Sequence, residues 1–254
     1  MIAVAYCVVI VFLGMIGYLV KFMVQDSQEI INNPANKRQE LLAERIVRGD
    51  IVSSDGRVLA TTETDQKGNE TRVYPYKNVF CHVVGRVWNS KTGIELEQSF
   101  PLLTSHVNPL KQLSNQLQGQ KNQGDIVVTT LNAKLQQIAY DALGNQKGAV
   151  VAIEPSTGKI LAMVSKPDYD PNTVRSEWDS LVADEGGNSA LLNRATQGLY
   201  PPGSTFKILT AMEYMRENPS FDKYRYECSG SDTFGGNVIR CYNGEHHGPD
   251  DLIS

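Results

Sequence analysis

The residues best suited to chemistry in this sequence are Ser204 and Lys207, which stand three positions apart. From Phe206 onward, large apolar residues recur every three positions until an Asn-Pro pair at 218–219, a pattern that predicts a helix. Residues three apart on a helix share one face, so a serine hydroxyl and a lysine amine can meet there. A serine becomes nucleophilic when a base takes its proton, and a neutral lysine can be that base. The pair therefore predicts Ser204 as a nucleophile and Lys207 as its general base.

The sequence around the pair adds two expectations. Tyr-Pro-Pro-Gly at residues 200–203 breaks the chain immediately before Ser204, which places the serine in the first helical turn. Exposed N–H groups at such a helix start favour developing negative charge. Phe206, Ile208 and Leu209 predict an apolar setting that would keep Lys207 neutral. The spacing alone also fits a capping serine and a solvated lysine, so the rest of the sequence must decide.

Several elements precede the pair and would position it. Residues 126–130 predict a short strand, and residues 135–143 an amphipathic helix that stops at Gly144. Two apolar runs at 149–153 and 160–164, joined by a Pro- and Gly-containing turn, predict a buried hairpin. We expect a mixed α/β domain to begin near residue 125.

The front half of the sequence has a different character. Alternating apolar residues around Asp55-Gly56 predict a β-hairpin within residues 48–60. Residues 73–97 are β-biased and rich in turns, residues 27–44 are polar and compatible with a helix, and residues 101–124 are rich in Gln, Asn and Ser. This last stretch predicts a surface segment or an interdomain connection.

The first residues predict a membrane anchor. Residues 2–20 contain no charged side chain, and this uncharged run is long enough for a helix that spans a bilayer. A cleaved signal usually has a shorter apolar region followed by a small-residue cleavage site, and none follows Lys21. Lys21 itself lies after the run and argues weakly against a cytoplasmic N-terminus.

Charge and cysteine content limit the partners. Lys and Arg number 24 against 28 acidic residues, which gives a formal charge of −4. The sequence contains no cluster of Lys and Arg, so nucleic acid is not a predicted partner. Cys228 and Cys241 flank a Gly-rich stretch that could bring them together, either as a disulfide or as two free thiols. The spacing offers too few ligands for zinc, because His246-His247 lack a second matched pair, and no metal or cofactor is predicted.

Longer strings resemble a known family. Leu-Leu-Asn-Arg-Ala-Thr-Gln-Gly-Leu-Tyr-Pro-Pro-Gly-Ser-Thr-Phe-Lys, residues 191–207, is similar to the nucleophile region of penicillin-binding proteins. Residues 148–165 look like the hairpin that opens their transpeptidase domain, and residues 168–172 resemble the next segment. Residues 33–38, 48–51 and 55–60 resemble the pedestal of the class B branch.

The resemblance implies an α+β architecture in three parts. These are a single transmembrane anchor at 1–24, a β-rich, elongated, dimerisation-like pedestal with its connector at 25–124, and an incomplete mixed α/β transpeptidase domain at 125–254. It places most of the chain outside the cytoplasmic membrane, against the weak argument from Lys21. It also implies partners in the division or elongation machinery.

The resemblance also implies a reaction. Ser204 would attack the penultimate D-alanine of a peptidoglycan stem peptide ending in D-Ala-D-Ala, release the terminal D-alanine and form an acyl-enzyme. An amine of a second stem would then complete the cross-link. β-Lactams would acylate the same serine and leave slowly.

The sequence departs from the family after Lys207. The Ser-x-Asn and Lys-Thr/Ser-Gly triplets are expected downstream of the nucleophile, and residues 208–254 contain neither. The triplet Lys91-Thr92-Gly93 precedes Ser204 and is rejected as catalytic. We therefore expect residues 1–254 alone to be inactive.

Three rival interpretations remain. A class D β-lactamase shares Ser-Thr-Phe-Lys but lacks an anchor and a long pedestal. A β-lactam sensor would need more membrane segments than the single apolar run provides. A truncated, non-catalytic product could still act as a binding or scaffold protein in cell-wall synthesis.

Overall fold

The computed structural model describes residues 2–26, 38–184 and 186–252. The chain divides into two compact units, residues 1–198 and residues 199–254, and each is described by itself. Residues 33–37 of the pedestal-like stretch lie outside the described residues, as do Ile253 and Ser254.

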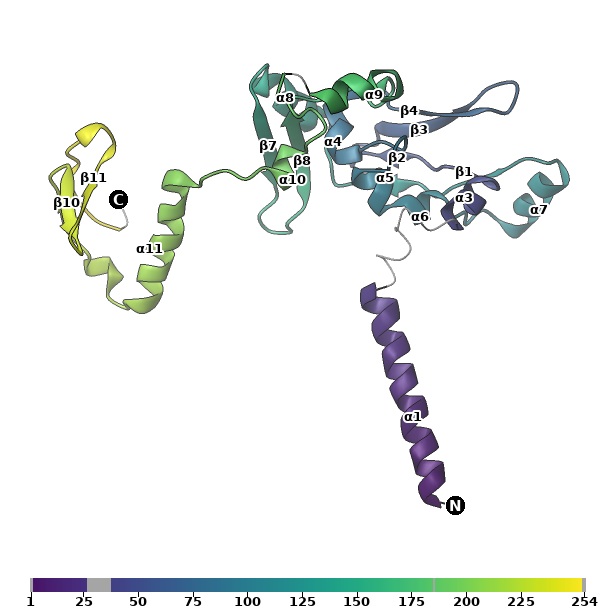
Figure 1. Ribbon diagram of the computed structural model, residues 1–254, viewed down its shortest axis with the longest axis horizontal. Helices are drawn as coiled ribbons and strands as arrows, with labels where there is room; N and C mark the ends of the chain where they lie inside the picture. The colour runs from purple at the N-terminus through teal and green to yellow at the C-terminus, as the bar shows by residue number, and fades with distance from the viewer. Residues whose placement is uncertain (1, 27–37, 185, 253–254) are drawn as a thin grey trace. The chain divides into compact units, whose positions relative to one another are not determined.

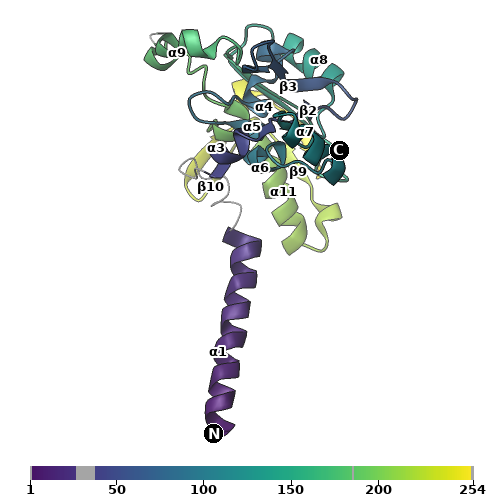
Figure 2. The same cartoon turned by 90° about the vertical axis from the view of Figure 1, so that its right-hand side faces the viewer.

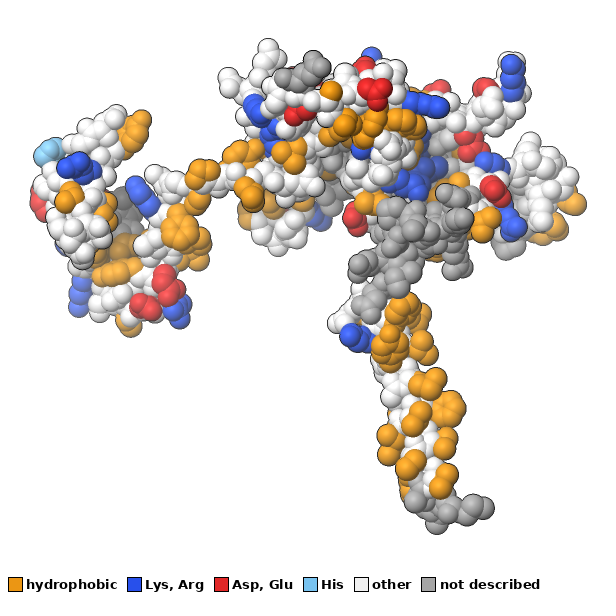
Figure 3. Space-filling model, viewed as in Figure 1, with side chains coloured by type: hydrophobic (Ala, Val, Ile, Leu, Met, Phe, Trp, Pro, Cys, Tyr) orange, Lys and Arg blue, Asp and Glu red, His pale blue; other side chains and the backbone are white. Residues whose placement is uncertain are grey.

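The first helix, α1 (Ile2–Lys21), continues into a π-helical segment, Phe22–Asp26. Residues 4–25 are long and apolar enough to cross a membrane by length and composition, and none of that stretch is buried against protein. Hydrophobic side chains cover this helix in Figure 3.

A four-stranded sheet combines strands from the predicted pedestal, residues 25–124, with one strand from beyond that boundary, and we call this sheet with its covering helices the pedestal. Its strands are β2 (Ile51–Val52), β3 (Val58–Thr64), β4 (Glu70–Val73) and β6 (Val127–Val128), in the order β4-β3-β2-β6. Strand β3 is antiparallel to β2 and β4, and β2 is parallel to β6. The predicted hairpin around Asp55-Gly56 is confirmed, with Gly56 at a φ of 78° in the turn. The strand predicted at 126–130 is shorter than expected.

Short helices cover this sheet where the sequence suggested strands. Residues 77–102 form a 3₁₀ turn (Lys77–Phe80), α4 (Cys81–Val84), α5 (Gly93–Glu97) and α6 (Ser99–Leu102). In both views α4 and α5 lie beside β2 and β3 (Figure 1 and Figure 2). The β-biased interpretation of residues 73–97 was wrong because four- and five-residue helices are too short to show a helical period.

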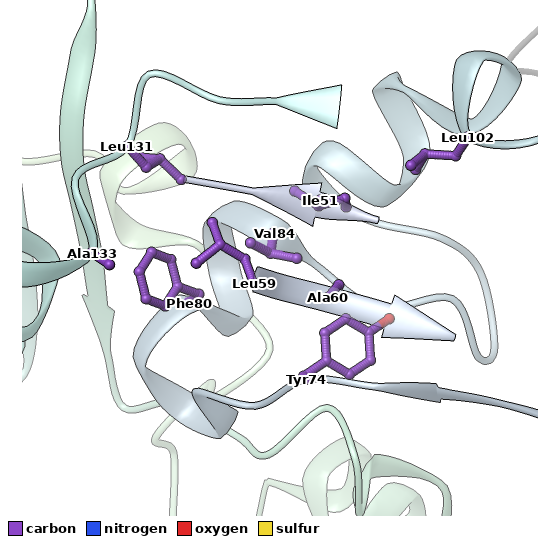
Figure 4. Packing of buried hydrophobic residues seen from close by; sticks show 9 residues of the cluster. All are labelled: Ile51, Leu59, Ala60, Tyr74, Phe80, Val84, Leu102, Leu131 and Ala133. Atoms are coloured by element: carbon purple, nitrogen blue, oxygen red, sulfur yellow. The ribbon is translucent and has the colours of Figure 1, made fainter. Parts of the chain in front are cut away.

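Nine buried residues form the core of this sheet and its helices (Figure 4). Fully burying one Leu, Ile or Phe side chain contributes about 1.5–3 kcal/mol, so this cluster is a main source of the pedestal's stability. The nine residues are Ile51, Leu59, Ala60, Tyr74, Phe80, Val84, Leu102, Leu131 and Ala133.

A helix and a hairpin follow the pedestal sheet. Helix α8 (Ala133–Leu143) begins at Asn132, whose side chain accepts a hydrogen bond from Leu135 N, and ends at Gly144 with a φ of 52°. Strands β7 (Gly148–Ile153) and β8 (Ile160–Lys166) pair antiparallel, and α8 packs on them through Ala139, Ala162 and Val164. The helix and the hairpin are confirmed. The expected burial holds for β8 but not for β7, because Val151 and Ile153 are exposed.

The remaining elements of the first unit lie around these two groups. The segment 101–124, expected to be a surface connection, contains the exposed helix α7. The elements are α3 (Arg38–Ala43), β1 (Ile46–Val47), α7 (Pro109–Leu117), β5 (Asn122–Gln123), α9 (Val174–Ala183) and α10 (Arg194–Gln197), with β1 and β5 paired in parallel.

The second unit contains a helix and two small antiparallel sheets. Strand β9 pairs with β12, and β10 pairs with β11 across a Gly235-Gly236 turn. Its elements are the 3₁₀ turn Gly203–Thr205, α11 (Phe206–Glu217), a 3₁₀ turn (Phe221–Lys223), β9 (Tyr226–Cys228), β10 (Ser231–Phe234), β11 (Asn237–Arg240), a 3₁₀ turn (Tyr242–Gly244) and β12 (Gly248–Asp250).

Candidate functional site

Ser204 lies in the 3₁₀ turn that leads directly into α11, and Lys207 lies in the first turn of that helix. Gly203, immediately before the serine, has a φ of 54°, a conformation that glycine adopts without strain. The Thr205 hydroxyl donates to Pro202 O at 2.6 Å and fixes the turn. Both Ser204 and Lys207 are exposed within the second unit. Ser204 therefore lies one helical turn before Lys207, as their spacing predicts.

The apolar surroundings expected for Lys207 are not formed within this unit. Phe206, Ile208, Leu209 and Met212 are all more than half exposed. These side chains lie on more than one face of α11, which is the pattern of a helix that other elements enclose. The expectation that Phe206, Ile208 and Leu209 desolvate the lysine is thus not met within this unit, because all three side chains are exposed.

The chain segment before this site is held firmly in the first unit. Arg194 is buried and donates to Ser189 O at 3.1 Å and to Asn188 O at 2.5 Å. Its backbone N–H donates to Ser165 Oγ on β8 at 2.9 Å, and the Asn193 side chain caps α10. These contacts fix the start of the segment that leads to Ser204. Sequence reasoning missed this role, although an Asn followed by a short helical stretch is a recognisable cap.

The rejected triplet Lys91-Thr92-Gly93 lies at the start of α5, far along the sequence from Ser204. Thr92 N donates to Arg86 O at 3.1 Å, and Gly93 has a φ of 57°. These features give the triplet a turn-forming place between α4 and α5.

A cavity of about 450 Å³ opens in the first unit between the pedestal helices and the segment around α10. The Arg86 side chain donates hydrogen bonds to Trp88 O, Asn89 O and Ser90 O. Its buried Nε has no hydrogen-bond partner among the described residues. Burial lowers the pKa of His82, which lines the same cavity. The full lining is His82, Val83, Arg86, Thr92, Gly93, Ile94, Glu97, Met163, Tyr169, Leu191, Asn193, Thr196 and Gln197.

A compact group of three possible metal ligands lies in the second unit. The Sγ atoms of Cys228 and Cys241 are 3.3 Å apart, and Cys228 Sγ is 3.4 Å from His247 Nδ1. The structure has no bond between these two sulfur atoms, which lie close enough that a disulfide needs only a small movement. Hydrogen bonds from His247 lower the pKa of Cys228 to about 6, and the bond from Cys228 raises the pKa of Cys241.

Two thiolates and an imidazole are ligands that zinc accepts, so this group can supply three of the four positions of a tetrahedral site. The sequence analysis set His246-His247 aside as zinc ligands, because His247 reaches Cys228 only through the pairing of β12 with β9, where Gly248 stands opposite Cys228. Two Cys and a His within twenty residues were the available signal.

Comparison with known proteins gives one consistent result. Residues 148–252 match the family model "Penicillin binding protein transpeptidase domain". The chain is 37% identical over 194 residues to the peptidoglycan D,D-transpeptidase PbpA of Mycolicibacterium smegmatis, which covers 70% of this chain and 39% of that protein. It is 31% identical over 208 residues to MrdA of Escherichia coli K12, which covers 65% of this chain and 32% of that protein.

The solved structures agree. A structure of penicillin-binding protein A from Mycobacterium tuberculosis, an imipenem acyl-enzyme complex, superposes with a TM-score of 0.70 at 31% identity. The match covers 82% of this chain and 52% of that one. The chain spans about two fifths of the length of the mycobacterial PbpA proteins. From its sequence, its mixed α/β fold and these likenesses, the chain is a homologue of the class B penicillin-binding proteins and carries part of their transpeptidase domain.

Proposed function

We propose that this chain is the front part of a peptidoglycan D,D-transpeptidase that acts through Ser204. Ser204 Oγ attacks the carbonyl carbon of the penultimate D-alanine of a stem peptide, and Lys207 Nζ accepts the hydroxyl proton. The amide bond to the terminal D-alanine breaks, that residue leaves with a proton on its nitrogen, and an ester remains on Ser204. An amine of a second stem peptide then displaces Ser204 and forms the cross-link, returning the proton to the serine.

One observation carries this proposal. Ser204 stands in a turn at the start of α11, one helical turn before Lys207, within the residues that match the transpeptidase family. Free N–H groups at a helix start favour the negative charge that develops on an attacked carbonyl. The resulting arrangement suits acyl transfer.

The same serine is the proposed target of β-lactams. A solved relative is an acyl-enzyme with imipenem, and the chemistry requires only that Ser204 opens the strained lactam amide. We also infer that α1 anchors the chain in the cytoplasmic membrane with residues after 26 on the outer side, where stem peptides are found. Division or elongation proteins are the proposed partners.

The test is labelling with a fluorescent penicillin. Membranes of cells that express the complete gene product are labelled, with Ser204→Ala as the variant and Ser220→Ala, an exposed serine of the same unit, as the control. We expect labelling of the parent and of Ser220→Ala, and none of Ser204→Ala.

Two outcomes would change the proposal. Undiminished labelling of Ser204→Ala would remove Ser204 as the nucleophile. A complete gene product that carries no label at all, although it is membrane-bound, would favour a scaffold without catalysis. Residues 1–254 alone are expected to remain unlabelled, since the downstream triplets are not among them.

A further inference from the structure

Helix α7 presents its apolar side to the outside of the first unit. Leu110, Leu113 and Leu117 are 77%, 55% and 80% exposed. Their spacing of three and four residues places them on one face of the helix. Hydrophobic side chains are visible along the outer side of this helix in Figure 3.

The polar side of α7 is the side that the protein holds. Gln112 Nε2 donates to Ser105 O at 3.3 Å, and Asn115 Nδ2 donates to Asn122 Oδ1 at 2.9 Å. The Asn108 side chain accepts from Leu110 N at 3.0 Å and caps the first turn. These bonds fix the rotation of the helix with its leucines outward. A surface helix of a water-soluble protein normally turns its apolar face toward the core. The outward leucines of α7 therefore indicate an apolar neighbour outside the unit.

Helix α7 lies where the chain enters the pedestal from α1. It leads into β5, which pairs with β1 through Ile46 and Asn122, and Lys121 Nζ donates to Ala43 O at the end of α3. Only residues 27–37 separate the end of the π-helical segment from α3. Even fully extended, that connection spans about 40 Å. If α1 crosses a bilayer, the start of α3 is therefore held within that distance of its surface, and the segment after α7 is bonded to the other end of this six-residue helix.

The composition of α7 favours lipid over a charged protein partner. Its nine residues include one charged side chain, Lys111, and no acidic one, so anionic headgroups would not be repelled. A strongly amphipathic helix of low overall hydrophobicity is the kind that lies in the membrane interface with its apolar face among the acyl chains. We propose that the leucine face of α7 rests in the surface of the bilayer that holds α1 and so sets the tilt of the pedestal. This inference depends on the proposed anchor and is independent of the proposed chemistry at Ser204.

The test places a photoreactive benzoylphenylalanine at position 113 of the full chain in proteoliposomes of phosphatidylethanolamine and phosphatidylglycerol. Position 111, exposed and on a different side of the same helix, is the matched control. After illumination, mass spectrometry of the peptide that contains α7 measures its lipid adducts. We expect at least fivefold more lipid adduct from position 113 than from position 111.

Equal adduct yields at the two positions, or a covalent dimer from position 113 in place of lipid adducts, would overturn the inference. In native membranes, a cross-link from position 113 to another protein in place of lipid would do the same. Alkaline extraction of the same vesicles checks the anchor separately. A chain that resists extraction but yields no lipid adduct refutes the role of α7 alone, whereas an extractable chain refutes the anchor.

Discussion

Arg48 and Glu95 form a buried ion pair, with Arg48 Nε and Glu95 Oε2 2.6 Å apart. Glu95 also pairs with Arg72, whose Nε lies 2.7 Å from Oε1, and it accepts a hydrogen bond from the Tyr74 hydroxyl at 3.3 Å. Its side chain is fully buried. One carboxylate thus joins the segment before β2, the strand β4 and the helix α5.

Removing the charge of Glu95 should destabilise the pedestal. Glu95→Gln leaves two buried guanidinium groups without their counter-charge, and breaking a buried pair typically costs about 3–5 kcal/mol of the free energy of unfolding. Thermal unfolding of the full chain in detergent measures the change. The matched control is Glu213→Gln, which removes an exposed carboxylate from its pair with Arg216 and should leave the melting temperature nearly unchanged. Equal melting temperatures for the two variants would show that Glu95 is not needed for stability.

Gln136 is expected to hold the pedestal to the hairpin of the transpeptidase part. Its side-chain amide donates to Val79 O and Met163 O and accepts from Met163 N, at 2.7 to 2.8 Å, with no exposure to solvent. Gln136→Ala leaves these backbone groups unsatisfied, and we expect a loss of about 3 kcal/mol in the free energy of unfolding. Gln137→Ala, the adjacent position, is the control and should lose far less. Hydrogen exchange at Met163 N–H measures the local effect, and unchanged protection there would contradict the assignment.

Gly124 should not tolerate a side chain. A Cβ at this position would lie 2.1 Å from Leu102 O, and Gly124 N donates to Val47 O at 2.8 Å. Because backbone atoms surround the site, Gly124→Ala is expected to cost roughly 3 kcal/mol of the free energy of unfolding. Gly148→Ala is the control, since its nearest neighbour would be Leu143 Cδ1 at an ordinary 3.9 Å. Chemical denaturation compares the two, and the prediction fails if Gly148→Ala is the more destabilised variant.

Acidification should weaken the first unit through His82. Burial and the nearby Arg194 lower the pKa of His82 below its usual 6.5, while the Pro167 carbonyl and Asp168 oppose that shift. The unfolded chain therefore takes up a proton at a higher pH than the folded chain. The contribution of neutral His82 to the free energy of unfolding is therefore complete above pH 6.5, and it is lost as the pH falls from that value through the folded pKa.

Deuterium exchange at the histidine ring, followed by mass spectrometry between pH 5 and 8, measures this pKa directly. We expect a lower midpoint for His82 in the folded chain than in the same chain unfolded in urea. His82→Gln should show a smaller fall in melting temperature between pH 7 and pH 5.5 than the parent. A folded midpoint at or above the unfolded one would reverse the conclusion.

Local signals explain what the sequence predicted well. The Asp55-Gly56 turn, the Asn132 cap and the Gly144 stop each act within a few residues, and β2, β3 and α8 follow from them. The helical spacing of Ser204 and Lys207 is local too. The spacing alone also fitted a capping serine and a solvated lysine, so their roles rest on the family resemblance and stay predictions.

Contacts between distant residues explain what the sequence did not reveal. Arg48 and Glu95 are 47 positions apart, and nothing in either segment predicts their pairing. His247 joins Cys228 only through strand pairing, and α7 turns its leucines outward because Gln112 and Asn115 find partners elsewhere. The side chains expected to enclose Lys207 are exposed because enclosure depends on other elements, not on the neighbouring residues of one helix.

The short connection between β6 and α8 has a mechanical consequence. Strand β6 belongs to the pedestal sheet, and four residues later α8 begins against β8, with Thr130 Oγ1 bonded to Ile160 O and Asn132 N bonded to Leu161 O. There is almost no slack in this joint. A force on the pedestal is therefore transmitted directly to the hairpin, whereas a long flexible linker would absorb it.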